Sequence, residues 1–443
     1  MHLFLIGAGH VGLVTAVGLA RLGHHLTVAD IDKTRIANLV RGVPPVFEPG
    51  LEEAIGRCAG AGLLAFTTDL TPPPDCAISI VTVSTPSGPD GPLSTVNVER
   101  VVASLLERMT AMHTIVVRST LPIDGPARLL ALRDGRAQSP SIVTNPEFMR
   151  EGSALADFDR PDRLIVGWLE ERDRDAARAV LDLYVGIDSP TLVADARSVA
   201  LIKLATNVFL AAKVAYANEL ARICDVVGAD VDTVADGIGL DPRIGRSFLT
   251  AGPGYGGSCL PEQAIALSLI TAARGIPTPL IEAVSRSNET HQRAIVTRLA
   301  SLLEDGSPSV EKPGARGDGL RGRRIALLGL AFKANTDDVR ESPALSLARH
   351  LRRAGATVVG TDPQAVAKAR LADPELLTAD TVREAVVNAD AVLVATEWQA
   401  FAGLDWADLG GRMAGDLVYD TRDVVSPDQV RAAGLRYVSL GRA

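Results

Sequence analysis

A cysteine at the end of a glycine-rich stretch is the residue best suited to covalent chemistry. The stretch from Gly252 to Pro261 reads GPGYGGSCLP, and four glycines within six positions precede Cys259 closely. Glycines let backbone amides wrap an anion or a sugar. A thiol at the start of a helix can have a lowered pKa and act as a nucleophile. The alternative is a small buried hydrophobe, which is what free cysteines commonly are.

Polar residues in two other segments suit the same chemistry. Lys203 and Asn207 lie four positions apart in a long helical stretch, so they share one helix face. Glu147 and Glu151 lie in NPEFMREG, which follows a strand end, where an open α/β sheet presents its ligand crevice. Taken alone, each is typical of a solvated surface. Taken together with Cys259, they favour a catalytic site.

The N-terminal GAGHVG motif predicts a dinucleotide site, because it follows a strand and opens a helix. Gly7 permits the tight turn, Gly9 admits a pyrophosphate, and Gly12 lets helix and strand pack closely, with free amides at the helix start. Asp30 ends the second strand, where its carboxylate suits ribose hydroxyls and repels a 2′-phosphate, so NAD is favoured over NADP. Asp32 lies beyond the strand end and is a weaker candidate for the ribose.

The elements that position these residues follow an α/β rhythm twice. This rhythm predicts two Rossmann-like doubly wound parallel sheets joined by a helical domain with one long helix. We expect a dinucleotide-binding α/β domain over 1–195, a central helical domain over 196–303, a flexible linker over 304–323 and a second α/β domain over 324–443. The expected strands are Leu3–Gly7, Leu26–Asp30, Cys76–Val83, Thr114–Arg118, Leu164–Gly167, Arg324–Gly329, Thr357–Asp362, Ala391–Ala395, Leu417–Asp420 and Arg436–Leu440.

Composition narrows the class of partner and the compartment. The net charge of -8 over 443 residues argues against a nucleic-acid or anionic-membrane partner. Four widely spaced cysteines without a CxxC pair predict reduced thiols and no metal site. The N-terminus begins with an apolar strand and no basic leader, and no apolar run reaches the ~20 residues of a membrane span. We therefore expect a cytoplasmic protein.

Over nearly its whole length the chain resembles the UDP-glucose/GDP-mannose dehydrogenase family of nucleotide-sugar dehydrogenases. The motifs that carry the resemblance appear in order along the sequence: GAGHVGL (7–13), FEPGLEE (47–53), STP (84–86), RSTLP (118–122), NPEFMREGSA (145–154), PDRLIVG (161–167), KLATNVFLAAK (203–213), DPRIGRSFL (241–249), GYGGSCLP (254–261), LAFKANTDDVRESPA (330–344), TEW (396–398) and YDTR (419–422).

The resemblance implies a four-electron oxidation of the C6 alcohol of a nucleotide sugar to a carboxylate, with two NAD. UDP-glucose is the favoured substrate. Cys259 matches the cysteine that holds the intermediate as a thiohemiacetal and then a thioester. Lys203 and Asn207 match the residues that stabilise the oxyanion. Glu147 and Thr120 match the groups that activate the hydrolytic water.

The resemblance also implies the binding residues and a homodimer built on the long helix. Arg243 matches an arginine that reaches the substrate site of the neighbouring subunit. Implied cofactor contacts are Gly7, Gly9, His10, Val11, Gly12, Asp30, Arg35, Ser84, Thr85, Thr120, Glu151 and Arg340. Implied substrate contacts are Glu147, Phe148, Met149, Arg150, Lys203, Asn207, Arg243, Phe248, Leu249, Tyr255, Gly256, Ser258, Lys333 and Arg422.

Three positions depart from the family pattern. Behind the cysteine the family has Cys-x-x-Lys-Asp, whereas this chain has Glu262-Gln263, and Ala200 stands where the family usually has a glutamate. An amide can hydrogen-bond water but cannot accept its proton, and general-base help is typically worth ~10²–10⁴ in rate. Glu262 would raise the pKa of Cys259 if it points inward.

Several interpretations remain open. The chain can retain the full oxidation, with Glu147 or Glu262 acting on the water. It can instead be slow at thioester hydrolysis or release the aldehyde, or it can bind NAD and a nucleotide sugar with little catalysis. Another nucleotide sugar is an alternative substrate. A two-electron NAD dehydrogenase acting on a small hydroxy acid shares the first domain and the long helix, but it needs neither a nucleophilic cysteine nor a second α/β domain.

Overall fold

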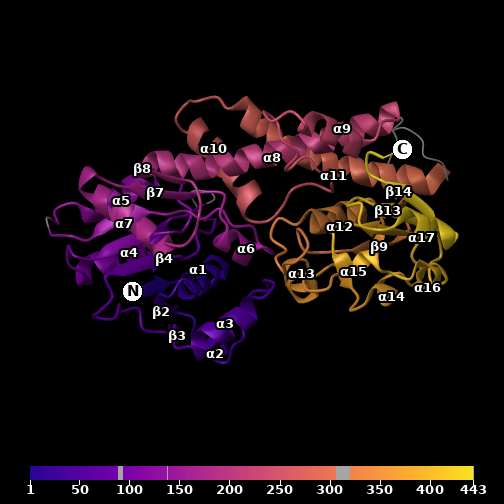
Figure 1. The fold of residues 1–443 in the computed structure, drawn as a ribbon. Helices are drawn as coiled ribbons and strands as arrows, with labels where there is room; N and C mark the ends of the chain where they lie inside the picture. The colour runs from indigo at the N-terminus through magenta and orange to yellow at the C-terminus, as the bar shows by residue number, and fades with distance from the viewer. Residues whose placement is uncertain (88–92, 137, 306–319, 443) are drawn as a thin grey trace. The chain divides into compact units, whose positions relative to one another are not determined.

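The structure is a computed structural model that describes residues 1–87, 93–136, 138–305 and 320–442. The chain divides into two compact units (Figure 1), Met1–Thr206 with Ala266–Ile276 and Asn207–Ile265 with Pro277–Ala443. Most of the predicted linker, 304–323, lies outside the described residues. The division into three domains and a linker stays a prediction.

The first unit is built on an eight-stranded sheet of order β3-β2-β1-β4-β5-β6-β7-β8. The strands from β3 to β6 are parallel, as predicted, whereas β7 runs antiparallel to β6 and β8 parallel to β7. The strands are β1 (His2–Ile6), β2 (His25–Ala29), β3 (Leu64–Thr67), β4 (Ile78–Val81), β5 (Thr114–Val117), β6 (Ser141–Thr144), β7 (Leu164–Trp168) and β8 (Thr191–Asp195).

Helices cover both faces of this sheet, so alternate residues of β1 enter different cores. Leu3 and Leu5 belong to one hydrophobic cluster, and Phe4 and Ile6 to the other. The helices are α1 (His10–Arg21), α2 (Lys33–Val40), α3 (Leu51–Gly60), α4 (Val96–Arg108), α5 (Gly125–Arg133), α6 (Ala154–Asp159) and α7 (Arg174–Val180), with short 3-10 turns η1 (Glu171–Asp173) and η2 (Leu181–Tyr184).

The predicted long helix is confirmed as α8 (Ala196–Val227), which begins in the first unit and ends in the second. It is long and apolar enough to cross a membrane by length and composition, a test that core helices of other proteins also pass. The helices that follow are α9 (Val231–Gly239), α10 (Cys259–Ala272) and α11 (Pro279–Asp305).

The second unit contains a six-stranded parallel sheet of order β11-β10-β9-β12-β13-β14. Its strands are β9 (Arg324–Leu328), β10 (Thr357–Thr361), β11 (Leu377–Thr378), β12 (Ala391–Val394), β13 (Leu417–Asp420) and β14 (Arg436–Ser439). Its helices are α12 (Pro343–Arg353), α13 (Val366–Ala372), α14 (Val382–Ala385), α15 (Gln399–Ala402), α16 (Trp406–Gly410) and α17 (Pro427–Ala432).

The six-stranded sheet and the first six strands of the other sheet share one doubly wound order, which reverses between β1 and β4 and between β9 and β12. Ligands bind outside the carboxyl ends of strands at such switch points. Two pairs of residues lie there, Gly7 with Thr82 and Gly329 with Thr396. The sequence predicts this arrangement because each expected first strand ends at a glycine.

The first unit contains a buried charge cluster formed by Arg133, Asp173 and Glu170. Arg133 and Asp173 have side chains that are each 1% exposed, and Nη1 of Arg133 lies 2.7 Å from Asp173 Oδ1. Glu170 also contacts Arg133 but is 44% exposed. Removing one partner of a buried pair leaves an uncompensated charge.

We expect Asp173→Asn to lower the free energy of unfolding by about 3–5 kcal/mol, because it leaves Arg133 without its buried carboxylate. The matched variant Glu170→Gln removes a half-exposed charge from the same arginine and should cost less than about 1 kcal/mol. Urea unfolding followed by circular dichroism measures both. Equal losses in the two variants would contradict the assignment.

Candidate active site

The glycine loop after β1 has the shape of a dinucleotide cradle. Gly7 has φ +112°, and a Cβ there would lie 2.8 Å from the backbone of Thr82. A Cβ on Gly12 would lie 1.9 Å from the Gly7 carbonyl oxygen. The Thr82 hydroxyl donates to that same oxygen at 2.8 Å. Any larger side chain would therefore distort the loop that must admit a pyrophosphate, so the residues present fit NAD.

Asp30 ties this loop to the end of β2. Its Oδ2 accepts from the Ala8 amide at 2.8 Å and from Arg35 Nη1 at 2.8 Å, and its Oδ1 accepts from the Asp32 amide. These three contacts use three of the about four acceptor positions that a carboxylate offers. Asp32 instead caps α2 through the Thr34 and Arg35 amides.

His10 contacts a carboxylate that the sequence motifs did not assign to the site. Its Nε2 lies 2.7 Å from Glu48 Oε2, and the same Glu48 accepts from the Gly152 and Ala154 amides at 2.7 and 2.8 Å. Burial alone would lower the pKa of His10. The hydrogen bond to Glu48 and the surrounding carboxylates outweigh burial and raise that pKa.

Glu147 and Lys203 form a buried ion pair within the first unit. The Lys203 ammonium lies 3.1 Å from Glu147 Oε1 and also donates to the Glu147 carbonyl. Burial would raise the pKa of Glu147, but the charges of Lys203 and Arg118 and the Met149 amide together lower it. Glu147 is therefore held as a carboxylate.

A buried arginine fixes the segment that carries Glu147. Arg118 donates to the Thr15 hydroxyl, to the carbonyl and the side-chain oxygen of Asn145, and to the Tyr184 hydroxyl. Asn145 also receives a 2.6 Å hydrogen bond from Tyr184 and donates to the Ile165 carbonyl. The start of the NPEF motif is thus bonded to α1, β5, β7 and the turn at Tyr184.

In the second unit Asn207 bonds the residue that replaces the family's aspartate. Asn207 Nδ2 donates to Gln263 Oε1 at 3.0 Å, and both side chains are buried. Cys259 begins α10 and is exposed. Glu262 lies near Arg340, Glu341 and Asp338. Burial raises its pKa, and the two acids add to that effect while Arg340 opposes it.

Side chains of α8 and α11 hold the glycine loop before Cys259. Gly254 has φ +124°, and a Cβ there would lie 2.7 Å from Asn288 Oδ1, which accepts from the Tyr255 amide. The Gly252 amide donates to Asn218 Oδ1 at 2.8 Å, and the Gly252 carbonyl accepts from His291 Nε2 at 2.7 Å. The loop backbone is therefore bonded on both sides of Pro253.

Residues that follow strands of the C-terminal sheet contact the same loop. Gly252 leaves room for Arg422, because a Cβ at that position would lie 2.9 Å from the guanidinium. Arg422 also donates to the Ala395 and Phe332 carbonyls. The Arg340 carbonyl accepts from the Gly257 amide at 3.1 Å. Lys333 lies over the Phe332 ring.

The DPRIGRSFL segment carries one exposed cation and one strained residue. The Arg243 side chain is 87% exposed and pairs only locally with Asp241 at 2.6 Å. Phe248 has φ +64°, an unfavourable conformation for an aromatic residue. Leu249 beside it is buried. Strain of this kind is common at ligand-binding segments.

The remaining predicted residues are distributed over both units. Thr120 is half-buried after β5, and Ser84 and Thr85 follow β4 with partly or fully exposed side chains. Arg163 and Lys203 lie over the Phe148 ring at 4.0 and 5.0 Å. Arg150 pairs with Asp157. Val11 lies in the first turn of α1, and the other predicted residues lie in the loops already described: Gly9, Met149, Glu151, Gly256 and Ser258.

Sequence reasoning missed Glu48, Arg118, Asn218, Asn288 and His291 as parts of the site. Glu48 and Arg118 stand inside motifs that were recognised, so their placement in those motifs was a usable signal. The other three lie on α8 and α11, where nothing local separates them from ordinary helical polar residues.

The comparisons with known proteins agree with this geometry. Three family models match in order: the NAD binding domain (residues 1–186), the central domain (197–290) and the UDP binding domain (326–427) of the UDP-glucose/GDP-mannose dehydrogenase family. The chain is similar to a UDP-glucose 6-dehydrogenase of Rhizobium meliloti (strain 1021), with 38% identity over 100% of both chains. It is also similar to a putative UDP-glucose 6-dehydrogenase, YtcA, of Bacillus subtilis (strain 168), at 36% identity over 100% of both chains.

A solved structure leads to the same result. The UDP-glucose dehydrogenase of the archaeon Pyrobaculum islandicum matches with a TM-score of 0.84 and 35% identity, over 100% of this chain and 98% of that one. Fold and site together define an NAD-dependent oxidoreductase with a second, nucleotide-binding α/β domain. The chain belongs to the UDP-glucose/GDP-mannose dehydrogenase family.

We expect Asp30→Ser to lower the preference for NAD over NADP by about tenfold or more, measured as the ratio of kcat/KM values. The change removes the carboxylate that repels a 2′-phosphate and leaves Arg35 beside the ribose position. Asp32→Ser is the matched control, because serine still caps α2 and the ratio should stay unchanged. An unchanged ratio in Asp30→Ser would contradict this role.

We expect the contact between His10 and Glu48 to stabilise the fold most at low pH. A raised folded-state pKa means that its contribution is complete below the unfolded pKa of about 6.5 and disappears as the pH rises through the folded pKa. His10→Gln should therefore lose more stability, relative to the parent, at pH 6 than at pH 9. Thermal unfolding at both pH values measures this, and a pH-independent loss would count against it.

Proposed function

We propose that the protein oxidises UDP-glucose to UDP-glucuronate with two NAD and one water, and that Cys259 is the nucleophile. The observation that carries the proposal is the buried Lys203–Glu147 pair of the first unit, with the buried Asn207 one turn further along α8; the second unit contributes an exposed cysteine at the start of α10. The names of the relatives agree with this substrate.

Bound NAD supplies the two-electron acceptor for both oxidations. The Cys259 thiolate adds to C6 of the aldehyde to form a thiohemiacetal, and loss of hydride from that carbon leaves a thioester. Water then attacks the thioester carbonyl, which releases the carboxylate and returns the thiol. Each oxidation removes two electrons from C6, which gives four in all.

Lys203 and Asn207 provide the charge and the amide donor that stabilise an oxyanion on C6. Lys203 is held in place by Glu147, so its ammonium is positioned before substrate arrives. Glu147, kept as a carboxylate by Lys203 and Arg118, is a suitable base for the hydrolytic water together with the Thr120 hydroxyl.

Gln263 is the feature that favours a second candidate function. It accepts from Asn207, as an aspartate would, but it cannot take a proton from water. Thioester hydrolysis then depends on Glu147 as the base, with the Thr120 hydroxyl, and an enzyme in which this fails would stall at the thioester or release the aldehyde.

We also propose a homodimer formed through α8. Phe209, Tyr216 and Ile223 repeat every seven residues along this helix, and they are 67%, 52% and 55% exposed. A seven-residue apolar repeat is the pattern by which helices pair. The exposed Arg243 suits a contact with substrate in the neighbouring subunit.

All four cysteines are free, which agrees with a reducing cytoplasm.

The test is the number of NADH formed per UDP-glucose consumed, with excess NAD, in the parent and in Cys259→Ser. Two NADH per sugar, abolished or stalled in the variant, would establish the thioester route. One NADH per sugar would indicate aldehyde release. Binding of NAD and UDP without turnover would point to another sugar or to a binding protein, which a panel of nucleotide sugars distinguishes.

We expect Gln263→Asp to speed thioester hydrolysis by at least about tenfold, because a restored carboxylate supplies general-base help worth ~10²–10⁴. Gln263→Asn is the matched control, since it shortens the side chain equally and keeps an amide. Single-turnover assays that follow thioester decay measure the step. No acceleration in the aspartate variant would show that Glu147 suffices.

A further inference from the structure

A cavity of about 610 Å³ lies within the second unit, lined by α8, α11, α17 and the end of the C-terminal sheet. The residues of the glycine loop and Arg422 do not line it, among the described residues. Its volume falls in the ~300–1,000 Å³ range of small-molecule sites.

Positive charge dominates the wall of this cavity. Five arginines line it against three aspartates, and all three aspartates already have partners in the described structure. Asp225 pairs with Arg298, Asp423 lies 3.5 Å from Arg442, and Asp230 accepts from the Thr233 amide to cap α9. Arg222, Arg431 and Arg436 have no carboxylate partner among the described residues that line the cavity; outside the lining, Glu219 lies 3.8 Å from Arg222 and Asp416 lies 3.7 Å from Arg436.

Arg436 is the arginine of this wall that best suits an oxyanion. The Nη1 atom of Arg436 is buried and has no hydrogen-bond partner among the described residues, while its Nη2 donates to the Leu302 carbonyl. Arg431 lies over the Tyr437 ring at 5.8 Å. A buried guanidinium N–H without an acceptor is costly, and a phosphate oxygen is the acceptor that guanidinium groups match best.

The same wall is bonded to the loop that carries Cys259. Arg222 Nη1 donates to His291 Nδ1 at 2.8 Å, and His291 Nε2 donates to the Gly252 carbonyl at 2.7 Å. Burial, with the charge of Arg222, lowers the pKa of His291 to about 4, so the ring is neutral and accepts from Arg222. A ligand that binds Arg222 and breaks its hydrogen bond to His291 would weaken the contact that holds the Gly252 carbonyl.

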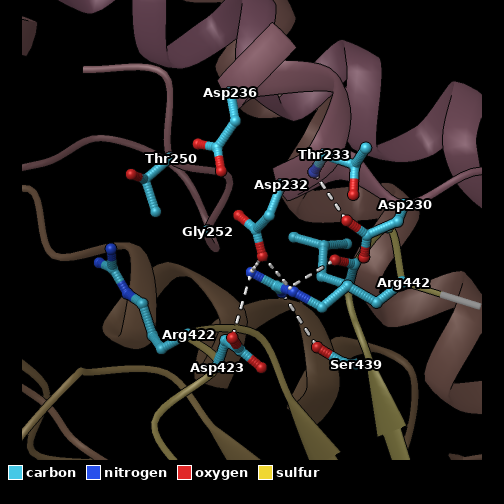
Figure 2. Close-up of polar contacts among 12 residues, drawn as sticks. Asp230, Asp232, Thr233, Asp236, Thr250, Gly252, Arg422, Asp423, Ser439 and Arg442 are labelled. Atoms are coloured by element: carbon cyan, nitrogen blue, oxygen red, sulfur yellow. Dashed lines mark hydrogen bonds and ion pairs between the residues drawn. The ribbon is translucent and has the colours of Figure 1, made fainter. Parts of the chain in front are cut away.

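A second set of contacts joins the wall to the DPRIGRSFL segment. Arg442 bonds Asp232 through Nε at 2.6 Å and also contacts Asp423 and Ser439, as Figure 2 shows. Asp232 in turn lies 3.6 Å from Arg246 of that segment. Both predicted substrate loops are therefore anchored on residues that line the cavity.

We propose that this cavity is a regulatory site for a small phosphorylated molecule, held by Arg222 and Arg436 and coupled to the two substrate loops. The coupling rests on the proposed function, whereas binding itself does not. A ligand there changes the affinity for the nucleotide sugar, and the sugar changes the affinity for the ligand by the same factor.

Calorimetric titration with inorganic pyrophosphate tests the site directly, with UDP and NAD at saturation to occupy the sugar-nucleotide and dinucleotide sites. We expect one pyrophosphate per chain in the parent, at least about tenfold weaker binding in Arg222→Gln and Arg436→Gln, and near-parental binding in Arg436→Lys. Arg383→Gln is the matched control, because Arg383 pairs with Asp408 and does not line the cavity.

Absence of pyrophosphate binding in the presence of UDP and NAD, or binding unchanged in both glutamine variants, would overturn the proposal. If Arg436→Gln does not fold, as judged by circular dichroism, the partly exposed Arg222 gives the answer alone. A chain that binds pyrophosphate but neither UDP nor NAD would refute the proposed function and still support the cavity assignment. In the parent, pyrophosphate should also shift the KM for UDP-glucose, and an unchanged KM would refute the coupling.

Discussion

The buried ion pair between Lys203 and Glu147 is the interaction on which the proposed chemistry depends. Two charges removed from water are stable only when each compensates the other, so neither side chain can move independently. The pair joins α8 to the segment after β6, and Arg118 fixes that segment from the other side. The same ion pair therefore positions both the ammonium proposed for the oxyanion and the carboxylate proposed for the water. Substrate binding energy is not needed to place either group.

The two sheets share the same switch-point geometry, but the acids that follow their second strands make different contacts. Asp30 accepts two loop amides and one arginine, which suits a carboxylate facing a ribose. Asp362 occupies the matching position after β10, but accepts from four amides and from Trp398 Nε1 at 3.0 Å. Its acceptor positions are exhausted. In the repeated architecture, one acid is therefore the one we predict to bind a ribose, and the other holds the surrounding backbone in place.

Most of the architecture was readable from the sequence because its signals are local. The ten expected strands and the long helix are confirmed, since buried parallel strands appear as short apolar runs and a 32-residue helix has no internal glycine or proline. The strands β3, β6, β8 and β11 were missed, and so was the antiparallel direction of β7. Short strands and strand direction are decided by tertiary packing rather than by local sequence. For the candidate site, the motif glycines and Asp30 were predicted from the sequence, whereas Asn288 and His291 depend on contacts between distant segments that no local pattern reveals.

The replacement of an aspartate by Gln263 illustrates how such a site can change while its geometry stays. An amide keeps the hydrogen bond to Asn207 and removes a negative charge from the neighbourhood of the proposed nucleophile. Burial raises the pKa of Glu262, and Glu341 and Asp338 add to that shift while Arg340 opposes it. Any gain in the thiolate character of Cys259 is therefore obtained at the expense of base catalysis on water. The buried Glu147, whose pKa is lowered by Lys203 and Arg118 despite its burial, is the carboxylate that we propose to compensate. Its pairing with Lys203 would then couple the proposed oxyanion-stabilising residue to the proposed hydrolytic base.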